Sequence, residues 1–327
     1  MKLLKYILVF ALSFSVFVLS YMFYLTLKPS EKVIEPISEV STEEKETIVK
    51  TDSKMQKEER INMVLLGIDR RSKDEGYRTD IMVVVSIDKA KNKALLVSLP
   101  RDLWWNGGRL NATYTAEGWS GLQTALETIT GIRPEKYILT DFVDFEWIVD
   151  SMGGVPVTVE TTFTDSQYPV DETFEYQTVT FTKGEEKLTG ERALIFSRSR
   201  KGDNDNGDWG RMKRQHLILK GMLQAVKQPT SIFKNMEVAK ALDMVTKGRM
   251  DTNITLSDAT YLWDLHKDWE KYQTVSKYMD YDYLFTPPMA EYGGAWVLAP
   301  IGGSYDTFKN DLKKVFDDTS AGIQTQP

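Results

Sequence analysis

Residues 6–27 constrain this chain more than any other part of its sequence. The run has no charged residue, and as a helix it is long enough to cross a hydrocarbon core of roughly 30 Å. The alternative is a cleaved signal peptide, but its apolar core usually has about 7 to 15 residues and ends in small residues. This run ends in Tyr21, Phe23 and Tyr24. It therefore predicts one uncleaved membrane helix, with residues 1–5 in the cytoplasm and the rest outside the cell.

The next segment, residues 28–60, has a different composition. It lacks Phe, Trp and Tyr and is rich in Glu, Lys, Ser and Thr, so it cannot bury enough apolar surface to stay folded. We expect an extracellular disordered tether.

The composition of the whole chain excludes several classes of function. Lys and Arg total 41 against 47 for Asp and Glu, and this net charge of -6 argues against a nucleic-acid partner, which requires a basic surface. Without cysteine there is no disulfide, thiolate zinc site or cysteine nucleophile. The chain has no nucleophile elbow and no Walker loop, and His216 and His266 are too scattered to indicate a catalytic triad. We expect His216 to lie on a helix face rather than to act as a base.

Three short apolar runs with the length and composition of strands open the predicted domain. They are residues 61–66, 81–87 and 94–99. The polar stretch 88–93 is short enough for a hairpin, so part of the sheet should be antiparallel.

Helices and further strands alternate beyond this hairpin. A helical apolar face ends at Gly131 and consists of Leu122, Ala125, Leu126 and Ile129. Strands are predicted at 137–139 and 155–159, around a helix at 142–152. Later helices are predicted at 189–197, 211–227, 231–245 and 257–270, and a surface insertion at 165–177. This order predicts a single α/β domain at 61–316 with a mixed central sheet flanked by helices, followed by a flexible tail at 317–327.

Arginine and aspartate recur together near the ends of the first three strands. Asp69 follows the first strand, Arg78 and Asp80 precede the second, and Arg101 follows the third. One interpretation is a set of solvated ion pairs, each worth less than about 1 kcal/mol. The other is that Asp69 and Asp80 hold one magnesium ion through oxygen, while the arginines bind phosphate oxygens in fork geometry.

A second basic cluster is denser than the first. It comprises Arg198, Arg200, Arg211, Arg214 and Gln215. On a helix beginning near Gly210 the last three share one face, beside an N-terminus that favours anions. This pattern predicts phosphate binding, and a solvated basic helix face is the alternative. The loop between the two halves is not an EF-hand, because Asp208 stands where that motif requires glycine.

The order of these segments resembles that of a known family, the LytR-CpsA-Psr proteins of bacterial envelopes. The likeness covers nearly the whole chain and is carried by residues 66–70, 78–80, 98–102, 110–114, 150–155, 188–190, 193–200 and 210–215. The family transfers a glycan phosphate from a polyprenyl pyrophosphate carrier to a peptidoglycan sugar hydroxyl, in a fold whose hydrophobic pocket holds the lipid. Such phosphoryl transfer requires mainly that the reactants are positioned and that the phosphate charge is neutralised, so no dedicated nucleophile is needed.

The resemblance also implies roles for particular residues. Asp69 and Asp80 would be ligands of magnesium, or of manganese, and Arg101 would complete the catalytic group. The implied pyrophosphate-binding residues are Arg78, Arg101, Arg198, Arg200, Arg211 and Gln215. The implied partners are the membrane, a peptidoglycan acceptor and a polyprenyl pyrophosphate-linked glycan, which is teichoic acid, capsular polysaccharide or another wall polysaccharide. The roles of Asp208 and of Trp104 with Trp105 stay open. Hydrolysis of the lipid pyrophosphate and a non-catalytic envelope receptor or regulator remain alternative functions.

Overall fold

The computed structural model describes most of the predicted domain. The described residues are 53–68, 78–170, 175–203, 207–226 and 251–317. They belong to one compact unit that begins at Thr51. Three expected features lie outside the described ranges: the membrane helix at 6–27, the helix at 231–245 and Asp69. None of the helices within these ranges is long and apolar enough to span a membrane.

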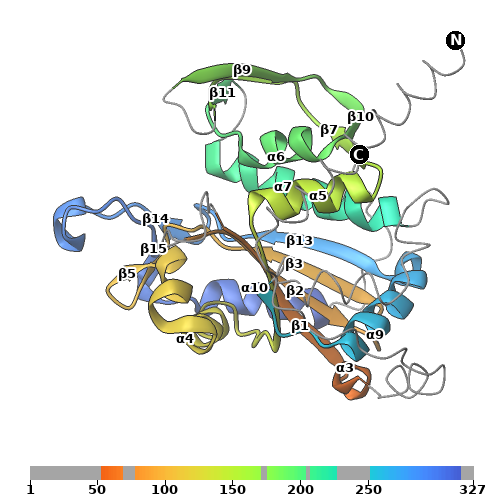
Figure 1. The fold of residues 1–327 in the computed structure, drawn as a ribbon. Coiled ribbons are helices and arrows are strands. Elements are labelled where there is room, and N and C mark those ends of the chain that lie inside the picture. Colours follow the sequence, from red (N-terminus) through yellow and green to blue (C-terminus); the bar gives the residue numbers. More distant parts are fainter. Residues whose placement is uncertain (1–52, 69–77, 171–174, 204–206, 227–250, 318–327) are drawn as a thin grey trace, which may run out of the picture. The chain divides into compact units, whose positions relative to one another are not determined.

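A six-stranded mixed sheet forms the centre of the domain, in the order β12-β6-β1-β2-β3-β13 (Figure 1). Its strands are β1 (Arg60–Ile68), β2 (Thr79–Asp88), β3 (Lys93–Ser98), β6 (Lys136–Thr140), β12 (Asp251–Thr252) and β13 (Gln273–Tyr278). β1, β2 and β3 form an antiparallel meander, whereas β6 pairs parallel with β1 and β13 pairs parallel with β3. The predicted hairpin and the mixed character of the sheet are confirmed.

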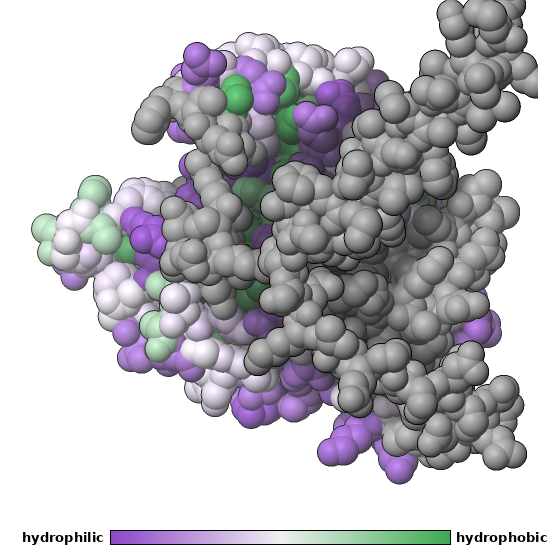
Figure 2. Space-filling view, viewed as in Figure 1, coloured by the Kyte–Doolittle hydropathy of each residue, from purple (hydrophilic) through white to green (hydrophobic). Residues whose placement is uncertain are grey.

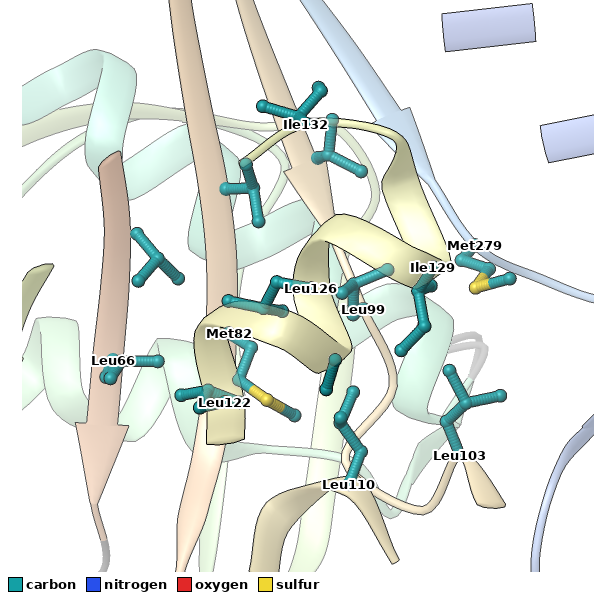
Figure 3. Packing of buried hydrophobic residues seen from close by; sticks show 14 of the residues in the cluster. Leu66, Met82, Leu99, Leu103, Leu110, Leu122, Leu126, Ile129, Ile132 and Met279 are labelled. Carbon is teal, nitrogen blue, oxygen red and sulfur yellow. The ribbon is translucent and has the colours of Figure 1, made fainter. Parts of the chain in front are cut away.

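The sheet is covered on both faces, as the alternation along β2 shows. Successive side chains of a strand point to opposite faces. Met82 and Val84 belong to a core shared with α4 (Thr113–Thr130) and α10 (Asp306–Asp317), which Figure 3 shows from close by. Val83 and Val85 face a second core, on which α3 (Lys54–Lys57) and α9 (Leu256–Lys267) pack. Burial on both sides explains the continuous apolar run at 81–87.

The folded domain begins before the expected boundary at residue 61. Ser53 is buried, and its Oγ donates to Oδ1 of Asp258 at 2.5 Å. Lys136 Nζ donates to Oδ2 of the same carboxylate at 2.6 Å. Burial alone would raise the pKa of Asp258, but these hydrogen bonds lower it to about 2. The polar composition of residues 28–60 concealed this contact because it depends on groups more than a hundred positions away.

Three helices separate the central sheet from two small sheets (Figure 1). The helices are α5 (Phe142–Ser151), α6 (Gly190–Arg198) and α7 (Gly207–Val226). The small sheets pair β7 (Val155–Val159) with β10 (Gly184–Leu188), and β8 (Phe163–Pro169) with β9 (Tyr176–Phe181) and β11 (Gly202–Asp203). A core of its own holds this layer together, with Phe163, Phe181, Phe196 and Ile218 among its members.

One expectation about this layer is confirmed and another needs correction. The strand predicted at 155–159 forms as β7, which pairs with β10 outside the central sheet. Its valines are buried on one face only, against α7, whereas an inner strand would be buried on both. Part of the expected surface insertion at 165–177 is the strand pair β8 and β9, and Tyr168 in it is buried.

Short elements complete the described fold. They are β4 (Trp104–Trp105), β5 (Gly108–Arg109), η1 (Leu110–Ala112), η3 (Trp269–Lys271), β14 (Leu284–Phe285), η4 (Met289–Tyr292), β15 (Ala299–Pro300) and η5 (Ile301–Gly303). Figure 1 shows β5, β14 and β15 at the same end of the domain. Gly131 ends α4 as predicted, with a φ of 70° that suits glycine. Gly118 interrupts the same helix with a φ of 66°.

Candidate active site

Five predicted pyrophosphate-binding residues and Asp80 line one cavity of about 360 Å³. Those five are Arg101, Arg198, Arg200, Arg211 and Gln215. They come from the loop after β3, the end of α6 with the residues after it, and the first turns of α7. Five basic side chains line this space, whereas the carboxylates in its lining are those of Asp80 and Asp165. We therefore call it the basic cavity. Helix ends and loops can converge in this way only in the folded chain.

Asp80 lies at the start of β2 and is held by two side chains. Arg101 Nη1 donates to Oδ2 at 2.5 Å, and Asn111 Nδ2 donates to Oδ1 at 3.1 Å. Arg101 also donates through Nε to Asp102 at 3.2 Å. Partial burial favours the neutral form of Arg101, but the carboxylates of Asp80 and Asp102 outweigh this effect and raise its pKa. The charged guanidinium is therefore fixed at the edge of the cavity.

Arg211 is a buried guanidinium of the cavity whose hydrogen bonding is incomplete among the described residues. Its side chain is buried, and its Nε has no hydrogen-bond partner among the described residues. Nη1 lies 3.4 Å from Oδ1 of Asp208. Burial lowers the pKa of Arg211, and although Asp208 opposes this, the charges of Arg101 and Arg200 lower it further. A buried N–H group without an acceptor can donate a hydrogen bond to an anion, and the neighbouring cations favour a negative charge there.

The end of α6 and the residues just after it form another wall of the basic cavity. The Arg198 guanidinium lies 4.1 Å over the Phe142 ring, and its Nη1 donates to the Tyr168 hydroxyl at 3.1 Å. The backbone N–H of Arg200 donates to Oδ2 of buried Asp165 at 3.2 Å. This bond links Arg200, shortly after the end of α6, to β8. The small sheet therefore helps to position part of the site.

Arg214 departs from the expected helix face. It does not line the cavity: its Nε donates to the Phe196 carbonyl at 2.8 Å, and its Nη2 donates to the Ser199 carbonyl. The last carbonyls of a helix lack intrahelical partners, and Arg214 satisfies those at the end of α6. Gln215 does line the cavity, and Lys213 is exposed.

An apolar cavity of about 280 Å³ adjoins the basic one. It lies between β1, β2 and β6 on one side and α5, α6 and α7 on the other, and Leu65, Val83, Ile138, Ile148, Leu194 and Ile218 are among its lining residues. Both cavities are lined by Gly67, Ile81, Phe142, Ser197 and Gln215. An apolar space therefore opens beside a strongly basic one.

Two predicted site residues remain. Asp69 lies outside the described residues, so its place relative to the cavity is not described. Arg78 is exposed and lines a neighbouring groove with Trp104 and Asn111 instead of the basic cavity. Across the described ranges, no group of three or more His, Cys, Asp or Glu side chains forms a ready-made metal site.

Sequence reasoning did not assign some residues of the site. Tyr168 and Gln167 line the basic cavity from the segment expected to be a surface insertion. The apolar positions Phe163, Val179 and Phe181 around that segment were the signal for a strand pair, but four polar residues in succession, 164–167, interrupt the alternation. His216, in contrast, is buried and bonded to Ser98 at 2.8 Å, and it lines neither cavity.

Curated relatives of this chain are cell-wall transferases. It is 28% identical over 216 residues to TagU of Bacillus licheniformis, a polyisoprenyl-teichoic acid–peptidoglycan teichoic acid transferase, and the match covers 64% of each chain. It is 28% identical over 231 residues to the transferase TagV of Bacillus subtilis, covering 67% of this chain and 57% of TagV. The chain thus matches somewhat less than two thirds of the length of these relatives.

Solved structures share the fold. A protein of Streptococcus agalactiae, gbs0355, superposes with a TM-score of 0.62 at 22% identity, covering 83% of this chain and 93% of the other. TagV of B. subtilis superposes with a TM-score of 0.58 at 23% identity, covering 80% and 98%. TagT bound to LIIa-WTA gives 0.57 at 19% identity, covering 83% and 96%. The profile of the LytR_cpsA_psr family matches residues 23–314, and the protein therefore belongs to this family.

Proposed function

We propose that this protein transfers a glycan phosphate from a polyprenyl pyrophosphate carrier to a peptidoglycan sugar hydroxyl. The observation that carries the proposal is the junction of the two cavities at Phe142 and Gln215. An apolar space that ends at a basic one suits an amphiphile with an isoprenoid chain and a terminal pyrophosphate. The names of TagU and TagV support the same class of substrate. The glycan would be teichoic acid, capsular polysaccharide or another wall polysaccharide.

The basic cavity would stabilise charge during transfer. The acceptor oxygen bonds to the phosphorus that carries the glycan, and the bond from this phosphorus to the bridging oxygen breaks. Polyprenyl phosphate leaves with that oxygen and, in the overall balance, with the acceptor proton. Arg101, Arg198 and Arg211 would bind the phosphate oxygens whose charge increases. Nε of Arg211 has no partner among the described residues, so none of these bonds would have to break first.

We further propose that Asp80 contributes to a magnesium or manganese site. Its carboxylate lines the basic cavity, where pyrophosphate oxygens would lie, and magnesium commonly binds one or two carboxylates together with substrate phosphates. Oxygen donors of this kind fit the ion, and Asp69 would be a second ligand. The bound ion would neutralise charge on the pyrophosphate. Arg101 and Asn111 hold the Asp80 carboxylate in position.

The membrane helix proposed at residues 6–27 would keep this site outside the cell, near lipid carriers. Protease added to intact spheroplasts should then digest the domain. Its survival while the membrane stays sealed would put the site in the cytoplasm and rule out transfer to the wall.

Product analysis tests the proposed reaction directly. The full chain in detergent, given a lipid pyrophosphate-linked glycan and peptidoglycan, should release polyprenyl phosphate and attach the glycan phosphate to peptidoglycan. Equal release without peptidoglycan would identify a hydrolase. Tight lipid binding without turnover would identify a receptor. Either result contradicts transfer.

The metal proposal is tested with Asp80→Asn. The substitution should raise the magnesium concentration needed for half-maximal turnover by roughly 10-fold to 100-fold, the scale seen when a group supporting a metal is lost. Asp264→Asn is the control, because Asp264 is an exposed carboxylate on α9 paired with a lysine. Equal turnover of the unmodified protein in chelator and in magnesium would show that the metal assignment is wrong.

A further inference from the structure

The loop between β14 and β15 is attached to the segment that carries Arg101. The Trp104 N–H donates to the Leu298 carbonyl at 2.8 Å, and the Leu298 N–H donates to the Asp102 carbonyl at 3.0 Å. Residues 286–298, which we call the projecting loop, thus start and end beside the catalytic candidate Arg101. Figure 2 shows apolar surface on this side of the molecule, and Met289 and Trp296 are exposed.

A chain of charged contacts links the loop to the basic cavity. Asp80 binds Arg101, Arg101 binds Asp102, and Asp102 Oδ1 lies 3.3 Å from Nε of Arg109. Arg109 in turn donates to the Trp296 carbonyl through Nε at 3.2 Å and through Nη2 at 3.0 Å. The position of Trp296 is therefore coupled to the guanidinium at the edge of the basic cavity.

Two recesses run from the basic cavity along the projecting loop. The first, of about 420 Å³, shares Arg101, Arg200 and Lys201 with the basic cavity and is also lined by Trp296. The second, of about 490 Å³, shares Arg109 with the first and contains Trp104 and Tyr292. We call the two recesses together the aromatic groove.

The groove and the apolar cavity meet the basic cavity through different residues. The residues that the basic cavity shares with the groove are Arg101, Arg200 and Lys201. Those that it shares with the apolar cavity form a separate set, in which Phe142 and Gln215 lie. In phosphoryl transfer the attacking and leaving oxygens lie roughly in line. If the leaving polyprenyl phosphate points to the apolar cavity, the groove is a separate opening through which the attacking oxygen can reach the basic cavity.

The chemistry of the groove suits a saccharide. A sugar ring has an apolar C–H face and a rim of hydroxyl groups. Trp104 and Tyr292 pack edge to face with centroids 5.0 Å apart, and the polar side chains of Arg78, Asn111 and Glu291 surround them. Aromatic rings combine a large apolar area with low conformational entropy, so half-exposed rings beside hydrogen-bonding groups fit a glycan strand.

We infer that the aromatic groove binds the acceptor glycan strand and directs its hydroxyl toward the basic cavity. The inference rests on the proposed function for the role of the glycan, but binding itself is measurable without any turnover. Trp104 and Trp296 are the contact residues, and Arg109 is a positioning residue that holds the Trp296 backbone. The ligand class is a β-linked amino-sugar polymer with free hydroxyl groups.

The binding test uses the full chain in detergent and a soluble, peptide-free peptidoglycan tetrasaccharide, without lipid donor. Calorimetric titration should show saturable binding, and Trp104→Ala and Trp296→Ala should each weaken it by roughly 10-fold, the loss expected for one stacked ring. Trp147→Ala is the matched control, since Trp147 on α5 is 37% exposed and Trp296 is 38% exposed. Absence of saturable binding, or equal binding by all variants, overturns the assignment.

Kinetics separate acceptor from donor. The two groove variants should raise KM for the acceptor strand while kcat and the KM for the lipid donor stay unchanged. Arg109→Lys should shift acceptor KM in the same direction, because lysine cannot reproduce the two-nitrogen contact with the Trp296 carbonyl. A rise in donor KM alone would assign the groove to the donor glycan and overturn the inference, with transfer itself intact. Tetrasaccharide binding without any transfer would instead defeat the proposed function and leave the groove standing as a saccharide site.

Discussion

Two buried arginines on opposite sides of α7 differ in their hydrogen bonding. Arg211 and Arg214 lie one turn apart and are almost equally buried, at 8% and 6% exposure. On the core side, Arg214 donates to carbonyls at the end of α6 and lies 4.6 Å over the Phe163 ring. On the cavity side, Nε of Arg211 has no acceptor in the described part of the chain. Burial alone therefore does not distinguish these two arginines, and hydrogen-bond satisfaction does.

Nε of Arg211, which has no acceptor among the described residues, lowers the stability of the folded state. A buried donor without a partner costs about 1–3 kcal/mol, and nearby Arg101 and Arg200 add repulsion. Such local conflicts persist where function requires them. A phosphate group would supply both the missing acceptor and the missing negative charge.

The largest expected effect is on the cavity side. Arg211→Lys and Arg101→Lys keep the charge but lose the planar fork, so each should lower turnover by roughly 10²-fold to 10³-fold, the cost of removing one preorganised donor. Thermal stability of the Arg211 variant should not fall, because Nε of Arg211 has no hydrogen bond to lose within the described part of the chain.

Lys213 is the control for this measurement, because it is exposed on the same helix between the two arginines. Lys213→Ala should leave turnover intact. Full turnover in both lysine variants would show that generic attraction suffices and would remove the distinction between the two sides of α7.

A smaller effect is expected within the apolar cavity. Ile148→Trp should partly fill the apolar cavity. If two methylene groups of the lipid are displaced, at about 0.8 kcal/mol each, donor affinity should fall by roughly tenfold. A donor with a short lipid chain should be unaffected in a turnover assay. Equal loss for both donors would mean that the substitution disturbs the basic cavity instead.

Arg214→Met tests the core side. The substitution leaves two carbonyls at the end of α6 without donors, so the free energy of unfolding should fall by about 1–3 kcal/mol. Chemical denaturation measures this loss. Turnover per folded molecule should stay unchanged, and a loss of turnover at full stability would make Arg214 part of the site.

The smallest effect concerns pH. His216 lies on the core side of α7, bonded to Ser98 and packed on Tyr278, and burial lowers its pKa to about 3, with a further contribution from Lys220. The folded state keeps this ring neutral while the unfolded chain protonates near pH 6.5, so its stabilising contribution is complete above that pH and is lost progressively on acidification toward pH 3. His216→Gln should flatten the pH dependence of Tm between about pH 6.5 and pH 5. An unchanged slope would contradict a buried neutral ring.

Much of the fold followed from local pattern. The hairpin at 88–93, the helix that ends at Gly131 and the strand at 155–159 were all predictable, because alternation, helical spacing and glycine stops act over a few neighbouring residues. The basic residues after α6 and at the start of α7 were recognisable as one cluster for the same reason, because their spacing on short segments is visible in the sequence.

Tertiary structure alone decided how these pieces meet. It paired β7 with β10 instead of the central sheet, turned Arg214 to the end of α6 and placed Arg78 in the aromatic groove. It also set the apolar cavity beside the basic one. Each outcome depends on which carbonyls, faces and charges distant segments present to one another, and no local spacing encodes that.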